Sequence, residues 1–250
     1  MYPTLFGIID SYAAMVTLGL IAVFAIVEAY FRIRGLKKRV MYTVEILACI
    51  AVAVGFIFAI LTQNLYDFIE KGSAYEWTWA MTFYGGLIGG AGAFLGVYFL
   101  YYRRKEGPFL TKILVVAPAA ITAAHGFGRI GCFLSGCCYG IETDSWLGVL
   151  FPGMEHKVYP TNLFEAIFLL LFSGVLVFLA VKLDFKYNFT VYLIGYGIFR
   201  FLIEFIRGDH RGGLVPGLTP SQFWSIIMIL GGIAYIFLVP LMYKKDEKTC

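Results

Sequence analysis

The stretch His-Gly-Phe-Gly-Arg-Ile-Gly-Cys-Phe-Leu-Ser-Gly-Cys-Cys-Tyr-Gly, residues 125–140, places a histidine, an arginine and three cysteines among five glycines. Around it the chain is apolar: 60% of all residues are hydrophobic and 14% are charged, which is typical of a polytopic membrane protein. Lipid offers polar groups no water, so such a stretch is costly unless it lines a cavity or finds partners. We interpret residues 125–140 as the centre of a functional site.

Six apolar runs are long enough to cross a hydrocarbon core of about 30 Å; they cover residues 11–31, 42–63, 82–102, 161–181, 189–206 and 220–243. A shorter run, residues 110–125, is the fourth in chain order and brings the number of spans to seven. The chain is therefore predicted to be all-α, a polytopic membrane protein with seven transmembrane helices in a single integral domain over residues 1–250. Neither a basic leader nor a small-residue cleavage site is found before the first run, so we expect that run to remain as an anchor.

The basic residues predict the orientation of these helices. Lys and Arg concentrate in alternate connections, around residues 32–39, 103–112, 182–186 and 244–248. This bias predicts an N-terminus outside and a C-terminus in the cytoplasm, and it places loops at 126–160 and 207–220 on the outer side. We expect an active site built from these loops to face outward, and the net charge of +4 does not indicate a nucleic-acid partner.

Polar residues inside the apolar runs form a second signal. Arg129 has His125 one helical turn before it, and Glu165 lies near the start of the fifth run. Spacings of four, four and three residues put a further set on one helix face: Tyr196, Arg200, Glu204 and Arg207.

The arginines indicate the kind of ligand. Two guanidinium groups, Arg129 and Arg200, facing a cavity beside lipid headgroups suit a phosphate, which arginine can hold with two parallel hydrogen bonds. We infer an anionic phospholipid. The alternative for Arg200 and Glu204 is a structural ion pair between helices.

Several motifs together resemble those of the bacterial prolipoprotein diacylglyceryl transferases. Gly-Arg-Ile-Gly-x-Phe-x-x-Gly-x-x-Tyr-Gly at 128–140 resembles the signature of this family. Further motifs resemble the family in order and spacing: Ser-Tyr at 11–12, Phe-Tyr-Gly-Gly-Leu-Ile-Gly at 83–89, Tyr-Pro-Thr-Asn-Leu-Phe-Glu at 159–165 and Leu-Ile-Gly-Tyr-Gly-Ile-Phe-Arg-Phe-Leu-Ile-Glu-Phe-Ile-Arg at 193–207. The resemblance covers nearly the whole chain, and it implies a monomer in the bacterial cytoplasmic (inner) membrane.

The resemblance implies an enzyme that moves the diacylglyceryl group of phosphatidylglycerol to the lipobox cysteine thiol of an exported lipoprotein precursor. Phosphatidylglycerol and lipobox-bearing precursors are the implied partners, and no cofactor or metal is expected. The implied catalytic residues are Arg129, Arg200, His125, Tyr84 and Glu204. The implied substrate-binding residues are Tyr12, Gly128, Gly131, Gly136, Gly140, Glu165, Tyr196 and Arg207.

The chain also departs from the family's pattern. Tyr84 stands where the family has a histidine that is a candidate base for the thiol. Cys132 replaces an asparagine and Cys137 a glutamate, while His125 is additional and its imidazole suits proton transfer near neutral pH. The donor half of the site is thus retained and the acceptor half altered. One alternative is a paralogue with the same lipid donor and another acceptor, a glycan or another thiol; a second is a membrane thiol-redox or metal-handling protein.

Cys132, Cys137 and Cys138 leave four possibilities open. With His125 they could bind a metal, or Cys132 could form a disulfide with one of the other two. Cys137 or Cys138 could act as a nucleophile activated by Arg129 or His125. All three could also be small side chains that fill gaps beside the glycines.

Overall fold

A computed structural model describes residues 4–5, 8–106, 109–208 and 217–247 of the chain. Its helices are α1 (Ser11–Ile33), α2 (Lys38–Lys71), η1 (Gly72–Ala74), α3 (Phe83–Val97), η2 (Tyr98–Tyr102), α4 (Arg103–Glu106), α5 (Leu110–Leu134), α6 (Thr161–Val181), α7 (Asn188–Ile203), η3 (Glu204–Ile206) and α8 (Pro220–Glu247), and a short antiparallel pair joins β1 (Thr4–Leu5) to β2 (Ile9–Asp10). Among the described residues, seven helices are long and apolar enough to cross a membrane. The predicted all-α fold with seven spans is confirmed.

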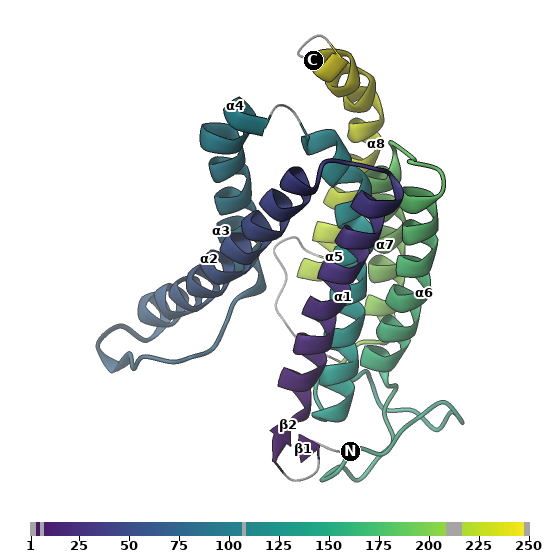
Figure 1. The fold of residues 1–250 in the computed structure, drawn as a ribbon. Coiled ribbons are helices and arrows are strands. Elements are labelled where there is room, and N and C mark those ends of the chain that lie inside the picture. The colour runs from purple at the N-terminus through teal and green to yellow at the C-terminus, as the bar shows by residue number, and fades with distance from the viewer. Residues whose placement is uncertain (1–3, 6–7, 107–108, 209–216, 248–250) are drawn as a thin grey trace. The chain divides into compact units, whose positions relative to one another are not determined.

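The chain divides into two compact units. The α5 unit comprises residues 1–34 and 110–248, and the α2–α3 unit comprises residues 35–109 with 249–250. Within the α5 unit, α5 packs against α1, α6 and α7, and α8 packs against α7 (Figure 1). Helix α5 has the largest buried share of any span, so it forms the centre of this unit.

Helix α5 is longer than the sequence predicts. The fourth span was expected to end near residue 125, with an outer loop from 126, but the helix continues to Leu134. Glycine costs a helix interior about 1 kcal/mol relative to alanine, and here close packing offsets that cost. A Cβ atom on Gly126 would lie 2.9 Å from the Leu170 side chain, and one on Gly131 would lie 2.9 Å from Tyr12. The loop that follows α5 therefore begins at residue 135.

Glycines perform the same packing role in the α2–α3 unit. A Cβ atom on Gly85 would lie 2.4 Å from Thr62, and one on Gly90 would lie 2.9 Å from the backbone oxygen of Ala51. Close to the Gly85 contact, the buried side chain of Asn64 accepts a hydrogen bond from Thr78 N at 2.9 Å and donates one to Thr78 O at 2.8 Å. The glycines of α3 thus bring two helices together.

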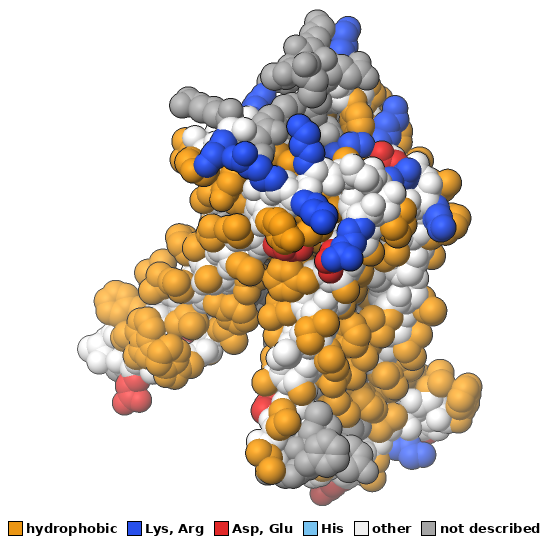
Figure 2. Space-filling view, viewed as in Figure 1, with side chains coloured by type: hydrophobic (Ala, Val, Ile, Leu, Met, Phe, Trp, Pro, Cys, Tyr) orange, Lys and Arg blue, Asp and Glu red, His pale blue; other side chains and the backbone are white. Residues whose placement is uncertain are grey.

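One end of the α5 unit is rich in basic residues. Asp184, between α6 and α7, accepts hydrogen bonds from Tyr30 at 2.7 Å and from Lys112 at 2.8 Å, and Arg34 reaches Ala180 O at 3.4 Å. These contacts join the end of α1, the start of α5 and the end of α6. Figure 2 shows Lys and Arg side chains gathered over the end of this unit where α1 finishes, while hydrophobic side chains cover its flank.

The Asp184 cluster gives a pH-dependent prediction. Burial favours a higher pKa for Asp184, but the hydrogen bonds from Lys112 and Tyr30 outweigh it and hold the pKa below its ordinary value of 3.8. A depressed carboxyl pKa means that the stabilisation is complete above 3.8 and is lost as the pH falls through the lower folded value. We expect Asp184→Asn to lower the free energy of unfolding at pH 7 by about 1 kcal/mol, because the pair is partly exposed and screened.

Thermal unfolding in detergent at several pH values checks this. The difference between wild type and Asp184→Asn should shrink as the pH falls below 3.8. The exposed Asp144 is the matched control, and its Asn variant should unfold like the wild type at every pH. A difference for Asp184→Asn that does not change with pH would contradict the assignment.

Candidate functional site

A buried network of charges lies at the opposite end of the α5 unit, where the end of α5, the start of α6, the end of α7 and the start of α8 meet. Five side chains alternate in sign along it: Arg129, Glu165, Arg207, Glu204 and Arg200. The side chains of Glu165 and Arg207 are 0% and 2% exposed, and that of Arg129, at 18%, is the most accessible of the five. Buried charges are tolerated when they are paired in this way.

Glu165, on α6, receives contacts from two other helices, α5 and α7. Its Oε2 lies 3.0 Å from Arg129 Nε, and its Oε1 accepts a hydrogen bond of 2.8 Å from the Tyr196 hydroxyl. His125 Nε2 lies 3.6 Å from the same Oε1, and its ring meets the Tyr196 ring edge to face with centroids 5.4 Å apart. Glu165 therefore fixes the side chains of Arg129, Tyr196 and His125 relative to one another.

The α7 side of the network follows the predicted helical stripe. Arg200 Nη1 lies 2.7 Å from Glu204 Oε2, as the four-residue spacing predicts. Arg207 lies between the two carboxylates, with Nη1 3.7 Å from Glu165 and Nε 3.8 Å from Glu204. All the residues of the stripe are buried. The predicted single helix face does not extend to Arg207, because α7 ends at Ile203 and Arg207 has extended backbone after the short turn η3.

The start of α8 supplies two members that the sequence analysis missed. Thr219 donates a 2.9 Å hydrogen bond to Glu204, and Ser221 accepts one of 2.7 Å from Arg200 Nη2. Thr219 also forms a capping box with Gln222, in which each side chain accepts from the other's backbone N–H, and Pro220 occupies the first helical position. The sequence Thr-Pro-Ser-Gln at 219–222 is a helix-start motif. It could have indicated that these side chains begin a helix close to the charged stripe.

The two arginines predicted to bind phosphate differ in how many of their terminal nitrogen atoms already contact protein groups. Both terminal nitrogens of Arg200 are engaged, by Glu204 and Ser221. Arg129 pairs with Glu165 through Nε, and its two Nη groups have no partner among the described residues. Guanidinium Nη groups match the oxygens of a phosphate or carboxylate. The site thus presents one pair of guanidinium Nη groups, called here the Arg129 fork, to an anion. The buried carboxylate of Glu165 holds this guanidinium group in place through Nε.

The glycines predicted to bind substrate have two different surroundings. A Cβ atom on Gly140 would lie 2.3 Å from Ile206 O, because Gly140 pairs with Arg207 in an antiparallel bridge. Gly131 packs against Tyr12, in the first turn of α1. Gly128 has nothing within 4 Å of the position of a Cβ atom. Gly131 and Gly140 therefore allow close packing, while Gly128 borders open space beside Arg129.

Gly140 gives a stability prediction. We expect Gly140→Ala to lower the free energy of unfolding by about 1–3 kcal/mol, because a methyl group cannot fit beside the Ile206 carbonyl without moving the backbone. Gly174→Ala is the matched control: no atom lies within 4 Å of its Cβ position in α6, so the variant should be as stable as the wild type or more so. Equal unfolding temperatures for the two variants would contradict this packing.

The turn after α5 gathers the three cysteines. Cys137 N donates to Cys132 O at 3.0 Å and Gly136 N donates to Phe133 O at 3.2 Å, the two hydrogen bonds of a Schellman motif with Gly136 at φ +72°. This turn brings Cys137 back beside Cys132, and the sulfur atoms of these two residues and Cys138 lie within 4.8 Å of one another. All three are free thiols, and His125 is not part of the group.

The thiols after the helix differ in acidity. Hydrogen bonding from the Cys132 thiol lowers the pKa of Cys138 to about 5, and the Arg129 and Arg207 guanidinium groups act in the same direction. Burial, together with the nearby Cys138, raises the pKa of Cys137. The Arg129 and Arg207 guanidinium groups thus favour a thiolate at Cys138, as expected for a thiol beside cationic side chains.

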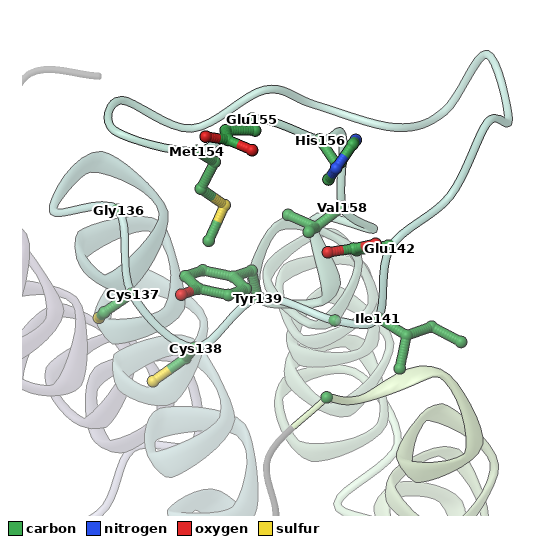
Figure 3. Close-up of a pocket in the computed structure, with 12 residues that line it drawn as sticks. Gly136, Cys137, Cys138, Tyr139, Ile141, Glu142, Met154, Glu155, His156 and Val158 are labelled. Atoms are coloured by element: carbon green, nitrogen blue, oxygen red, sulfur yellow. The ribbon is translucent and has the colours of Figure 1, made fainter.

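An open pocket of about 780 Å³ adjoins the cysteines (Figure 3). Its walls come from the loop 135–160 and from Gly208. Figure 3 shows Met154, Glu155 and His156 on one arm of the loop, and the Cys137 and Cys138 sulfur atoms pointing away from that arm, toward the helices. The pocket therefore borders the turn that carries the cysteines, while the two thiol groups face the helices.

Comparisons with known proteins bear on this arrangement. The family described as prolipoprotein diacylglyceryl transferase matches residues 4–238. A phosphatidylglycerol–prolipoprotein diacylglyceryl transferase of Clostridium tetani is 33% identical over 250 residues, which is 96% of this chain and 97% of that protein. The chain belongs to the prolipoprotein diacylglyceryl transferase family.

Two other relatives agree with this assignment. A phosphatidylglycerol–prolipoprotein diacylglyceryl transferase of Clostridium perfringens, numbered 2 in its name, is 34% identical over 97% of this chain and 96% of its own. One of Geobacter sulfurreducens is 32% identical over 91% of this chain and 90% of its own. The family resemblance inferred from the motifs is thus confirmed.

The structure assembles most of the residues that the family resemblance selected. It brings His125, Arg129, Glu165 and Tyr196 into one contact group, and the α7 stripe adjoins them. Tyr84 belongs to α3 in the other unit, and its side chain lies outside the described residues. The role predicted for Tyr84 therefore stays a prediction.

Proposed function

We propose that this protein is a phosphatidylglycerol–prolipoprotein diacylglyceryl transferase of the bacterial inner membrane. The relatives that match nearly the full chain carry this activity in their names. The observation that carries the proposal is the Arg129 fork, backed by the buried Glu165 and left with two Nη groups for an anion. A phospholipid is the anion most accessible to a site among membrane-spanning helices, because its phosphate can enter the site from the bilayer.

The reaction fits this charge arrangement. The acceptor thiol loses its proton, and its sulfur forms a bond to the glyceryl carbon of the lipid while the bond from that carbon to the phosphate oxygen breaks. The electron pair goes to the oxygen, so the phosphate of the departing glycerol phosphate gains negative charge. Donors fixed where charge develops lower the barrier, and Arg129 is such a donor.

The other members of the network position Arg129 or add to the local field. Glu165 and Tyr196 hold the Arg129 side chain, while Arg200 and Arg207 contribute positive charge without releasing their carboxylate partners. His125, beside Glu165, is the imidazole nearest to this network among the described residues. We assign it the transfer of a proton near the acceptor.

The orientation of the site follows from the basic residues. The end of the α5 unit that holds Arg34, Lys112 and Lys182 is opposite the end that holds Glu165 and Arg129. The positive-inside rule assigns the basic end to the cytoplasm. The network and the loop 135–160 then face the outer side, where an exported precursor presents its lipobox cysteine.

A transfer assay tests the proposal. Purified protein is incubated with labelled phosphatidylglycerol and a lipobox peptide, with a peptide that carries serine in place of the cysteine as the control. We expect label on the cysteine peptide, none on the serine peptide, and release of glycerol phosphate in equal amount. No transfer to the cysteine peptide, with consumption of the lipid only when membrane extract is added, would indicate another acceptor and overturn the thiol assignment.

A further inference from the structure

We propose that Cys132, Cys137 and Cys138 bind a zinc ion with an open fourth position, and that the acceptor thiol binds there. This inference rests on the proposed function and departs from the expectation that no metal is present. The three sulfur atoms lie within 4.8 Å of one another. Zn–S bonds of about 2.3 Å in tetrahedral geometry put sulfur atoms about 3.8 Å apart, so side-chain rotations that close about 1 Å suffice.

The backbone of the three cysteines is already fixed. The Schellman turn sets Cys137 beside Cys132, and Cys138 has φ +60°, a left-handed conformation that is strained for a residue other than glycine. Asn162 donates a 2.7 Å hydrogen bond to Cys137 O, and Thr161 donates one of 3.2 Å to Cys138 O. Both donors are fully buried. Strain that is held by buried partners is characteristic of functional sites rather than of simple gap filling.

The number and type of ligands indicate zinc. Thiolates select soft or borderline ions, chiefly Zn²⁺ and Cu⁺. No fourth His, Cys, Asp or Glu side chain joins the group among the residues that the structure describes. Three protein ligands with one exchangeable position are the arrangement of catalytic zinc sites, whereas structural sites have four protein ligands.

The position of the group explains what the open ligand site can do. Cys132 follows Arg129 by three residues on α5, so the two side chains share a helix face. An acceptor thiol on the metal would therefore lie about one helical turn from a phosphate on Arg129. A thiol that coordinates zinc gives up its proton readily, and His125, to which proton transfer is assigned above, or water accepts it. Its sulfur can then form the bond to the glyceryl carbon as the carbon–oxygen bond breaks.

This arrangement also accounts for a sequence difference. The family resemblance places a histidine base where this chain has Tyr84, and an asparagine where it has Cys132. A metal that makes the thiol more acidic removes the need for a base at position 84. Both replacements then follow from one change in the way the acceptor is activated.

The test measures metal first and activity second. The full-length protein is purified in detergent, its zinc and copper contents are determined, and Co²⁺ is then exchanged in as a spectroscopic probe. Thiolate-to-cobalt charge-transfer absorption reports the number of bound thiolates, before and after addition of the lipobox peptide. The variants are Cys132→Ser, Cys137→Ser and Cys138→Ser, with Cys49→Ser, an exposed cysteine of the α2–α3 unit, as the matched control.

We expect about one zinc ion per chain, and charge-transfer absorption that rises by about one third with the cysteine peptide and not with the serine peptide. Each cluster variant should bind Zn²⁺ at least about 100-fold more weakly, while Cys49→Ser binds it like the wild type. A wild type without thiolate-to-cobalt absorption, one that binds copper alone, or cluster variants with unchanged zinc affinity would overturn the site.

Activity separates this inference from the proposed function. Full transfer by metal-free protein would retain the transferase and overturn the role of zinc. Zinc binding with the peptide-dependent absorption, but no lipid transfer, would retain the metal site and overturn the transferase.

Discussion

Arg129→Lys is expected to lower kcat/KM for lipid transfer by about 10²–10³, the cost of losing one fixed donor to developing negative charge. Lysine keeps the positive charge and can still approach Glu165. It cannot present two parallel N–H groups to a phosphate, and its ammonium is a flexible point charge rather than a planar fork. The loss of activity therefore reports on the geometry of the donor rather than on net charge. It is measured as the rate at which label passes from phosphatidylglycerol to the lipobox peptide.

Two comparisons make this prediction specific. Arg32→Lys, at the exposed basic end of α1, should transfer lipid at the wild-type rate. Arg129→Ala should be at least as impaired as Arg129→Lys, because it removes both the charge and the fork. If Arg129→Lys retained activity to within about threefold of the wild type, a bidentate contact to the phosphate would be excluded.

Glu165→Gln is expected to lower the free energy of unfolding by about 3–5 kcal/mol, the usual effect of breaking a buried ion pair by removing one partner. The carboxylate is 0% exposed and lies against Arg129 and Arg207. Glutamine has nearly the same shape but no charge, so both guanidinium groups would face a neutral amide at a position with no exposed surface. Activity should fall as well, because Arg129 loses the group that holds it.

Thermal unfolding in detergent, with and without phosphatidylglycerol, measures this effect. Glu155→Gln, an exposed carboxylate on the loop 135–160, is the matched control and should unfold like the wild type. An anionic lipid bound at Arg129 should restore part of the lost stability of Glu165→Gln, since it supplies the missing negative charge. A change below about 0.5 kcal/mol would place Glu165 with ordinary surface carboxylates and contradict its position in the network.

The spans could be predicted from sequence because a lipid bilayer demands long apolar helices, and their apolar runs are visible in the composition of each segment. The end of α5 could not. Residues 126–134 contain three glycines, which intrinsic preference assigns to a loop. Only contacts with Leu170 and Tyr12, on α6 and α1, make a helix of this segment, and such contacts are a property of the tertiary structure.

The candidate site shows the same division. The Arg200–Glu204 pair follows from a four-residue spacing on one helix. The central position of Glu165, between Arg129 of α5 and Arg207 after η3, depends on how three segments meet, and no local pattern contains it. The spacing of Cys132, Cys137 and Cys138 matches no common metal motif, because a Schellman turn rather than the helical or hairpin repeat brings the thiols together.

The most direct measurement is an experimental structure of the protein with phosphatidylglycerol bound. We expect the lipid phosphate within about 3 Å of the two Arg129 Nη groups, with Glu165 still on Nε and the acyl chains directed into the bilayer. A headgroup bound elsewhere, with the Arg129 Nη groups on a protein carboxylate or in bulk water, would contradict the account.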